Sequence, residues 1–353
     1  MLPDEPRVIS AVVVSLTVAW VLTPLAQKLA VRTGFYDHPR GYRAHAAPTA
    51  CLGGAAVMSG FLLAAVLFGH GFTRFAPILL CAIGLSVLGT LDDRFAVRPS
   101  YRVLAEVVAA AILWHYGLGW SFLQSGFEEL VLTTIWIVGF TNSFNLMDNM
   151  DGAASTVAAV CGAGLALQSL VWDDVGLAAL ALALSGACVG FLPYNLRARG
   201  PARIFLGDGG SMPIGFLVAA MAMNLPADER MGWPVLLVAA LCLGIPVLDT
   251  LLVVVSRTRR RVSIATGGRD HLTHRLHTKL TSPRAVAAAL ALTQAAVSGF
   301  AIVAAQSGRT TIIVTALGIL GLGVAAVAVL EHPAWATAGT QPAEPIAGTR
   351  QSD

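Results

Sequence analysis

Long apolar runs alternate with short polar stretches along most of the chain. A membrane-spanning helix needs about 20 mainly apolar residues, and continuous apolar runs lack the alternation of a membrane β-barrel. We therefore predict an all-α polytopic membrane protein in which strands are not expected. The predicted spans are eleven segments at about 8–30, 52–69, 76–91, 103–120, 127–147, 153–171, 175–194, 211–226, 233–255, 285–305 and 311–330.

The gaps between these runs are too short to hold a second folded domain. Residues 1–332 are therefore expected to form a single integral membrane domain, and residues 333–353, rich in small and polar side chains, a disordered tail. The chain starts MLPDEPR, with acids where a signal peptide has bases. The run from Val8 is accordingly predicted to be a permanent span.

The composition agrees with a membrane protein. Charged residues make up 12% of the 353 residues, whereas a soluble domain carries about 25%. A net charge of +3 gives no reason to expect nucleic-acid binding. The five cysteines form no CxxC pair, and four of them lie inside apolar runs. They are interpreted as small buried hydrophobic residues, not as a disulfide framework or a zinc site.

Basic residues are distributed unequally between the two sides of the predicted membrane domain. The loops on the side reached after the first span hold seventeen Lys and Arg, and the opposite side holds four: Arg7, Arg74, Arg230 and Arg309. The side rich in Lys and Arg faces the cytoplasm in membrane proteins. The N-terminus is therefore predicted outside, the C-terminus inside, and the chain in the plasma or inner membrane.

A polar stripe, NSFNLMDNMDG at 142–152, lies between two predicted spans. Asn142, Asn145, Asp148 and Asp151 recur three residues apart, so a helical continuation would place them on one face. A carboxylate in the bilayer centre costs roughly 2.5–3.5 kcal/mol, which favours a functional reading. The alternative from this stretch alone is a short solvated loop, where Asn, Asp and Gly are common.

Two further acidic sites fall on the same predicted cytoplasmic side. Asp92 and Asp93 are adjacent at the end of a span, and adjacent carboxylates repel unless a cation joins them. Asp208 lies in GDGGS at the start of another span, where helix amides suit an anion and an acid suits a metal held against phosphate. Alternatively, Asp92 and Asp93 only mark the polar end of a span, and GDGGS is a turn capped by its aspartate.

Histidines complete the polar clusters on this side. His271 and His274 lie three apart in DHLTHRL beside Arg275, and could bind a metal or, with Arg275, a phosphate. His45 in YRAHAAPT is a weaker candidate. The alternative is a basic loop attracted to anionic lipid. Together the clusters indicate magnesium-assisted phosphoryl transfer between a soluble and a membrane-embedded substrate. A transporter would place its ionisable groups near the midplane instead.

In these motifs the chain resembles the polyprenyl-phosphate N-acetylhexosamine-1-phosphate transferases, in particular their WecA-like branch, which is related to the MraY-like branch. The motifs that carry the resemblance, in order, are R-x-H-x-x-P with Gly53 and Gly54, LDDR at 91–94, the stripe at 142–152, FLPYN at 191–195, IFLGDGGSMPIGF at 204–216, PVLDT at 246–250 and DHLTHRL at 270–276.

The resemblance implies transfer of a sugar 1-phosphate, expected to be N-acetylglucosamine 1-phosphate, from a UDP-N-acetylhexosamine to a polyprenyl phosphate in cell-envelope glycan synthesis. It implies Mg²⁺, with Mn²⁺ as an alternative, at Asp208 and Asp93. It implies that Asp92 and Asp93 handle the lipid phosphate, with Asp92 as the candidate base, and it leaves open whether an aspartate acts as a covalent nucleophile or the lipid phosphate attacks directly. It further implies catalytic roles for His271 and His274, and substrate binding by His45, Asn142, Asn145, Asp148, Asp151, Asn195 and Arg275.

The chain departs from the family pattern at several positions. Asn149 stands where a Gly is usual in the stripe, and Thr273 where a His is usual. Other departures occur at Arg43, Ala50 and Cys51, and Ala96. They leave open a phospho-N-acetylmuramoyl-pentapeptide donor as the alternative within the class, and a transporter of an anionic metabolite as the alternative outside it. A homodimer is also left open.

Overall fold

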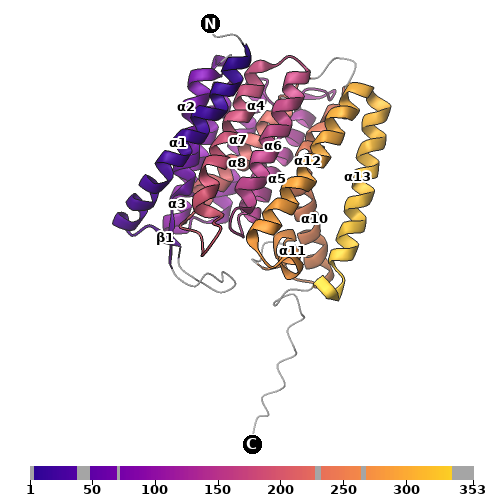
Figure 1. Cartoon of the computed structure of the whole chain (residues 1–353). Coiled ribbons are helices and arrows are strands. Elements are labelled where there is room, and N and C mark those ends of the chain that lie inside the picture. The colour runs from indigo at the N-terminus through magenta and orange to yellow at the C-terminus, as the bar shows by residue number, and fades with distance from the viewer. Residues whose placement is uncertain (1–3, 38–47, 70–71, 227–231, 264–267, 336–353) are drawn as a thin grey trace, which may run out of the picture.

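The structure, a computed structural model of the chain, describes residues 4–37, 48–69, 72–226, 232–263 and 268–335. Each predicted apolar segment coincides with a helix or with a broken pair of helices (Figure 1). The helices are α1 (Asp4–Thr33), α2 (Gly53–Phe68), α3 (Phe72–Phe95), α4 (Pro99–His115), α5 (Gly126–Met147), α6 (Ala153–Val171), α7 (Val175–Asn195), α8 (Asp208–Met223), α9 (Pro234–Cys242), α10 (Gly244–Arg259), α11 (Leu272–Leu280), α12 (Pro283–Ser307) and α13 (Arg309–Leu330).

Seven of the helices in the described part of the chain are long and apolar enough to cross a membrane, or eight if α9 and α10 form one span. This confirms an all-α polytopic membrane protein. Helices α2 and α8 are apolar but shorter, at 16 residues each. Large apolar side chains on α1 and α13 remain exposed, as expected where a helix faces lipid.

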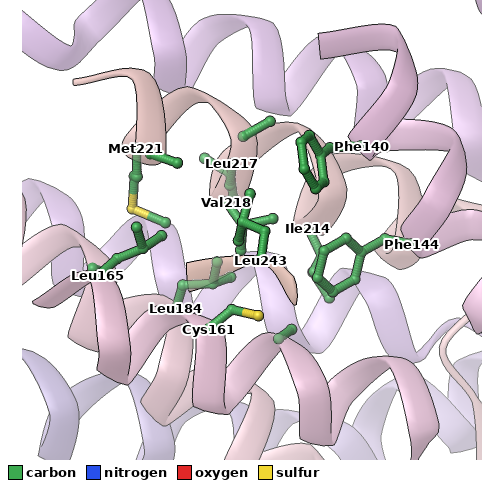
Figure 2. Close-up of a cluster of buried hydrophobic side chains, with 14 of the residues drawn as sticks. Phe140, Phe144, Cys161, Leu165, Leu184, Ile214, Leu217, Val218, Met221 and Leu243 are labelled. Atoms are coloured by element: carbon green, nitrogen blue, oxygen red, sulfur yellow. The ribbon is translucent and has the colours of Figure 1, made fainter. Parts of the chain in front are cut away.

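Helix α8 forms the centre of the bundle. Every residue of it from Gly209 to Met223 is buried. Figure 2 shows its Ile214, Leu217 and Val218 among side chains of α5, α6 and α7. At Gly215 a Cβ would lie 2.7 Å from the Phe140 carbonyl oxygen, so α5 and α8 approach at backbone distance. Small residues at such contacts are how helices pack closely inside membranes.

The ninth predicted span is not one straight helix. Helices α9 and α10 meet at Leu243 with a bend of 84°. The Gln294 side chain of α12 satisfies backbone groups at this break: Oε1 accepts from Ile245 N at 2.8 Å, and Nε2 donates to the carbonyls of Leu241 (3.2 Å) and Cys242 (2.9 Å). A break at membrane depth requires such partners because lipid offers none.

Three short strands contradict the expectation that the chain contains none. Strand β2 (Thr49–Cys51) pairs antiparallel with β1 (Tyr36–Asp37) and parallel with β3 (Ile204–Phe205). The prediction failed because strands of two or three residues leave no alternation to detect. Two further short elements were not predicted, α11 and a 3-10 turn at Pro333–Trp335, which takes the first residues of the expected tail.

The small sheet lies at one end of the helical bundle, together with α11 (lower end in Figure 1). Strand β3 leads directly into α8, so the sheet fixes where that helix begins. The ends of α3 and α5 and the start of α8 meet at this end of the molecule. The polar motifs within the described residues are therefore gathered at a single end.

Candidate active site

Asp93 caps the start of α8. Its carboxylate oxygens accept hydrogen bonds from the amides of Asp208 (3.0 Å) and Gly209 (3.1 Å). An acid at a helix N-terminus satisfies free amides and opposes the positive end of the helix dipole. The preceding Gly207 has φ +73, and a Cβ there would lie 2.5 Å from Asp93 Oδ2. Glycine is thus required for α3 and α8 to meet.

Backbone contacts fix Asp208 from two further directions. A Cβ on Gly89 of α3 would lie 2.2 Å from the Asp208 carbonyl oxygen, and one on Gly54 of α2 would lie 2.3 Å from the Gly210 amide nitrogen. No side chain fits at either of these two glycine positions. The start of α8 is consequently held by the main chains of α2 and α3.

Arg102 of α4 joins the acids of this centre. Its Nη1 donates to Asp92 Oδ2 at 2.5 Å and to Asp208 Oδ2 at 2.9 Å, and its Nη2 donates to Asn145 Oδ1 at 3.1 Å. Asn145 Nδ2 donates in turn to Asp208 Oδ1 (2.8 Å) and Ser211 Oγ (3.0 Å). The Asp208 carboxylate is therefore oriented by a cation and an amide while its side chain stays 27% exposed.

Asp148 is the fourth acid of this group. Burial, followed by the charges of Asp208 and Asp93, raises the pKa of Asp148 to about 8, although a hydrogen bond from the Gly207 amide opposes the shift. We call Asp92, Asp93, Asp148 and Asp208, with Arg102, the carboxylate centre. Four carboxylates crowded beside one arginine repel one another when ionised, and a bound cation would relieve that repulsion.

The histidine-bearing helix is built on a buried acid, Asp249 of α10. Its Oδ2 lies 2.8 Å from His271 Nδ1, and its Oδ1 accepts from the Leu272 amide at 2.6 Å, capping α11. His274 lies one turn later. Burial and the basic neighbours His271 and Arg269 lower its pKa from 6.5 to about 4, so the His274 imidazole is neutral at neutral pH. Asp249, His271 and His274 form the histidine centre.

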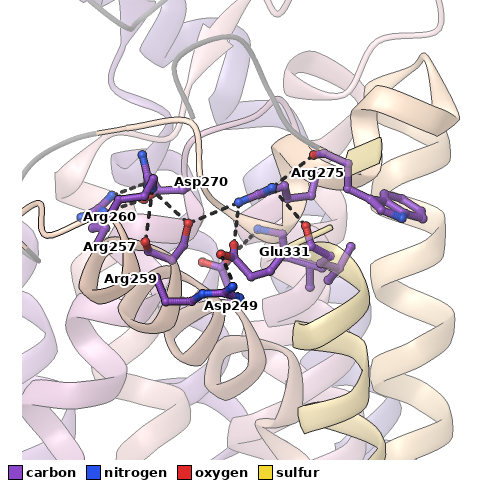
Figure 3. Close-up of polar contacts among 11 residues, drawn as sticks. Asp249, Arg257, Arg259, Arg260, Asp270, Arg275 and Glu331 are labelled. Atoms are coloured by element: carbon purple, nitrogen blue, oxygen red, sulfur yellow. Dashed lines mark hydrogen bonds and ion pairs between the residues drawn. The ribbon is translucent and has the colours of Figure 1, made fainter. Parts of the chain in front are cut away.

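Ion pairs dock the first half of α11 (Figure 3). Before the helix, Asp270 accepts from Arg257 Nε (2.8 Å) and from Arg260 Nη2 (2.7 Å). Within it, Arg275 Nη2 donates to Glu331 Oε1 at 2.7 Å. The three residues Arg257, Asp270 and Arg275 are each at most 3% exposed. The position of α11 thus depends on buried charge pairs with α10 and with the end of α13.

Arg275, predicted to bind substrate, is engaged by several groups of the protein itself. Its guanidinium also donates to the Leu330 carbonyl at 3.0 Å and to Ser256 Oγ at 3.3 Å. These partners hold it against α10 and the end of α13. Its ion-pair partner Glu331 lies 56 residues away along the chain, outside every recognised motif.

The polar stripe is divided between different partners. Because α5 ends at Met147, the stripe does not continue on one helical face. Asn145 donates to Asp208, and Asp148 is itself part of the carboxylate centre. Asn142 Nδ2 instead donates to Glu106 Oε2 at 2.6 Å, and Asp151 accepts from the Ala202 amide at 3.2 Å.

Asn195 and His45 are two further predicted site residues. Asn195 is 4% exposed, and its amide joins the Gly152 amide (2.6 Å) to the Ile204 carbonyl (3.0 Å). It ties the end of the stripe to β3 and has no free polar atom directed at a ligand. His45 lies outside the described residues.

Arg102 and Asp249 were not predicted as site residues. Arg102 entered the prediction only as one of the Lys and Arg residues that set the orientation in the membrane. It is the fourth residue of α4. Asp249 stands in the recognised motif PVLDT, and its isolation among apolar neighbours was the available signal. Their importance depends on partners 106 and 22 residues away in sequence, Asp208 and His271.

Comparison with known proteins gives a consistent assignment. The profile of glycosyl transferase family 4 matches residues 75–226, from within α3 to just beyond the end of α8. A decaprenyl-phosphate N-acetylglucosaminephosphotransferase of Mycolicibacterium smegmatis is 31% identical over 306 residues, covering 76% of this chain and 73% of the relative. A probable undecaprenyl-phosphate N-acetylglucosaminyl 1-phosphate transferase of Bacillus subtilis is 28% identical over 280 residues, covering 76% and 77%.

A more distant similarity extends to the other branch. A phospho-N-acetylmuramoyl-pentapeptide-transferase of Bacillus thuringiensis is 25% identical over 269 residues, covering 69% of this chain and 80% of the relative. The predicted family is confirmed, and the higher identities lie with the N-acetylglucosamine branch. The chain belongs to glycosyl transferase family 4, among the polyprenyl-phosphate N-acetylhexosamine-1-phosphate transferases.

Proposed function

We propose that this chain transfers N-acetylglucosamine 1-phosphate from its UDP donor to a polyprenyl phosphate and releases UMP. Its relatives at 28% and 31% identity are named for this transfer. The observation that carries the proposal is the bridge from Asp92 through Arg102 to Asp208 at the start of α8. The bridge brings two carboxylates and a guanidinium together at one point, where they can compensate the charge that develops during phosphoryl transfer.

The reaction exchanges one phosphorus–oxygen bond for another. An oxygen of the lipid phosphate bonds to the β-phosphorus of the donor, and the bond to the oxygen bridging the two phosphates breaks. That oxygen leaves with UMP, and any proton on the lipid phosphate passes to Asp92. Arg102 is placed to compensate negative charge on the phosphates. Asn145 is placed to hold the Asp208 carboxylate in position.

Magnesium, or manganese, fits this centre as the cofactor. In the described part of the chain no three His, Cys, Asp or Glu side chains form a ready-made metal site. Mg²⁺, however, is usually bound by one or two carboxylates plus substrate phosphates. Asp208 would hold the ion, with Asp93 through lone pairs that its two bonds to α8 leave free. The ion would neutralise charge on the diphosphate.

The other predicted residues fall into two groups in this proposal. Asp148 and Asp151 contribute to the nucleotide side, and His271 and His274 meet the diphosphate or the sugar. Asn142, Asn195 and Arg275 act as positioning residues, because their polar atoms are engaged within the protein.

The end of the bundle that carries the site is proposed to face the cytoplasm, with the N-terminus outside. The support is the seventeen-to-four distribution of Lys and Arg. An eleven-span arrangement additionally requires that the short helices α2, α4 and α8 cross the membrane and that α9 and α10 together form one span. Labelling of single cysteines placed in the loops with an impermeant reagent tests both points.

Exchange of labelled UMP into the UDP-sugar, in the presence of prenyl phosphate and Mg²⁺, tests the function directly. Purified wild-type protein should catalyse exchange with UDP-N-acetylglucosamine. Asp208→Asn should reduce it about 100- to 1,000-fold, the loss typical of a missing transition-state charge. Asp174→Asn is the matched control, because Asp174 lies at the start of α7 and pairs with Arg74.

A panel of donors separates the alternatives. Exchange with the N-acetylmuramoyl-pentapeptide donor alone would move the chain to the other branch, to which it is 25% identical. No exchange with any UDP-hexosamine, or full activity in Asp208→Asn, would contradict the enzymatic proposal and leave transport of an anionic metabolite to be tested.

A further inference from the structure

One side-chain hydrogen bond connects the neighbourhoods of the two centres. Thr273 Oγ1 donates to Asn149 Oδ1 at 2.5 Å, joining residues 124 apart in sequence. Asn149 directly follows Asp148 of the carboxylate centre, and Thr273 lies between His271 and His274 of the histidine centre. We call this pair the Asn149–Thr273 clasp.

The orientation of the clasp is determined by its surroundings. Asn149 Nδ2 donates to the Leu146 carbonyl oxygen at 2.6 Å, which leaves Oδ1 to face Thr273. Turning the amide over would place its oxygen against the Leu146 carbonyl oxygen, an unfavourable contact between two acceptors. Thr273 itself is 1% exposed, so its hydroxyl cannot exchange this partner for solvent.

The clasp is electrically neutral, unlike the contacts on either side of it. The carboxylate centre carries Arg102 and four acids, and α11 is docked by the ion pairs of Asp270 and Arg275. Charged groups suit the phosphates of a nucleotide sugar, whereas amides, hydroxyls and a neutral imidazole suit its hydroxyl and acetamido groups. The sugar C1 oxygen is bonded to the reacting phosphorus, so the sugar must lie next to the carboxylate centre.

We infer that the Asn149–Thr273 clasp determines sugar specificity. It does so by fixing the distance between the carboxylate centre and the histidine centre, and the donor hexosamine is held between these two centres. The inference rests on the proposed function for the identity of the donor. The clasp residues act as positioning residues: they hold Asp148 and His274 relative to each other, and need not touch the reacting atoms.

Thr273→Val removes the hydroxyl and keeps the side-chain shape. We expect kcat/KM for UDP-N-acetylglucosamine to fall about tenfold, as for a lost buried hydrogen bond. We also expect the preference over UDP-N-acetylgalactosamine, its C4 epimer, to fall, with KM for prenyl phosphate unchanged. Thr273→Ser should restore both values. The matched control is Thr278→Val, whose hydroxyl bonds only locally to the Arg275 carbonyl within α11.

Asn149→Ala provides a second route should Thr273→Val not fold. It should shift the donor preference in the same direction, and the double variant should show little more than either single change, because both remove one interaction. A uniform loss for every donor, with an unaltered preference, would show that the clasp only supports the fold and would overturn the inference. Wild-type protein inactive with all UDP-hexosamines would instead overturn the proposed function.

Discussion

The two centres at the active end are held in different ways. In the carboxylate centre, Asp208 is placed by main chains that touch at Gly54 and Gly89, and α8 behind it is buried along its length. In the histidine centre, the short helix α11 is held by side chains, including Asp249 and Glu331. Backbone contact gives a fixed position, whereas side-chain pairs give one that depends on charge and hydrogen bonding. The following predictions test this difference.

Gly89→Ala should have the largest effect. Its Cβ would meet the Asp208 carbonyl oxygen at 2.2 Å, a backbone atom that cannot rotate away. Overpacking costs about 1–3 kcal/mol or more, so we expect loss of activity and a lowered thermal midpoint in detergent. Gly84→Ala, on the same helix with nothing within 4 Å, is the control and should behave as wild type. A fully active Gly89→Ala would show that α3 and α8 can separate.

Asp92→Asn should come next. It retains a hydrogen-bond acceptor for Arg102 but removes the proposed base, and loss of general base catalysis lowers rates by about 100- to 10,000-fold. The measurement is kcat for UMP release across pH, with the thermal midpoint as a check on folding. Turnover near that of wild type at every pH would refute the base role.

Asp249→Asn should cause a smaller loss, of about 10- to 100-fold. Asn can still accept from the Leu272 amide, so α11 stays capped, but the charged partner of His271 is removed. Hydrogen bonds to charged groups contribute about 1.5–3 kcal/mol. The comparison is kcat/KM beside Asp174→Asn. An unchanged value would mean that His271 needs no buried acid.

The smallest effect is expected from pH. The pKa of His274 is lowered from 6.5 to about 4, so the unfolded chain binds a proton in this range and the folded chain does not. The contribution of His274 to stability is complete above pH 6.5 and is lost as the pH falls toward 4. Between pH 7 and pH 5 the thermal midpoint of the wild type should therefore fall relative to that of His274→Gln, whereas the raised pKa of Asp148 affects both proteins alike. Equal changes in both proteins would argue against the shift.

Much of the architecture was predictable because a helix that crosses lipid needs about 20 mainly apolar residues, which are visible in the sequence. Apolar runs predicted every helix except α11 to within a few residues, with α9 and α10 expected as one, and their order placed the described motifs at one end. The bend at Leu243 was not predictable, because apolar composition does not report a break that Gln294 stabilises from another helix.

The site was predictable only where its chemistry is local in sequence. Asp92, Asp93, Asp148 and Asp208 stood out because acids beside apolar runs are costly, and the structure brings them together. Arg102 was missed, and the ion pair of Arg275 with Glu331 was not expected, for one reason. A cation reveals its role through its partner, and each partner lies on a helix remote in sequence.

The glycine contacts around Asp208 also bear on resistance to inhibitors. Gly54, Gly89 and Gly209 are buried where helices meet, and a side chain added at any of them would strike a neighbouring helix. The position of Asp208 therefore cannot be altered at these glycines without disturbing the packing of the bundle. A compound that relies on α11 faces side chains such as Thr273, which a single conservative change can alter. Inhibitors that bind Asp208 should therefore be harder to escape by substitution than inhibitors that bind α11.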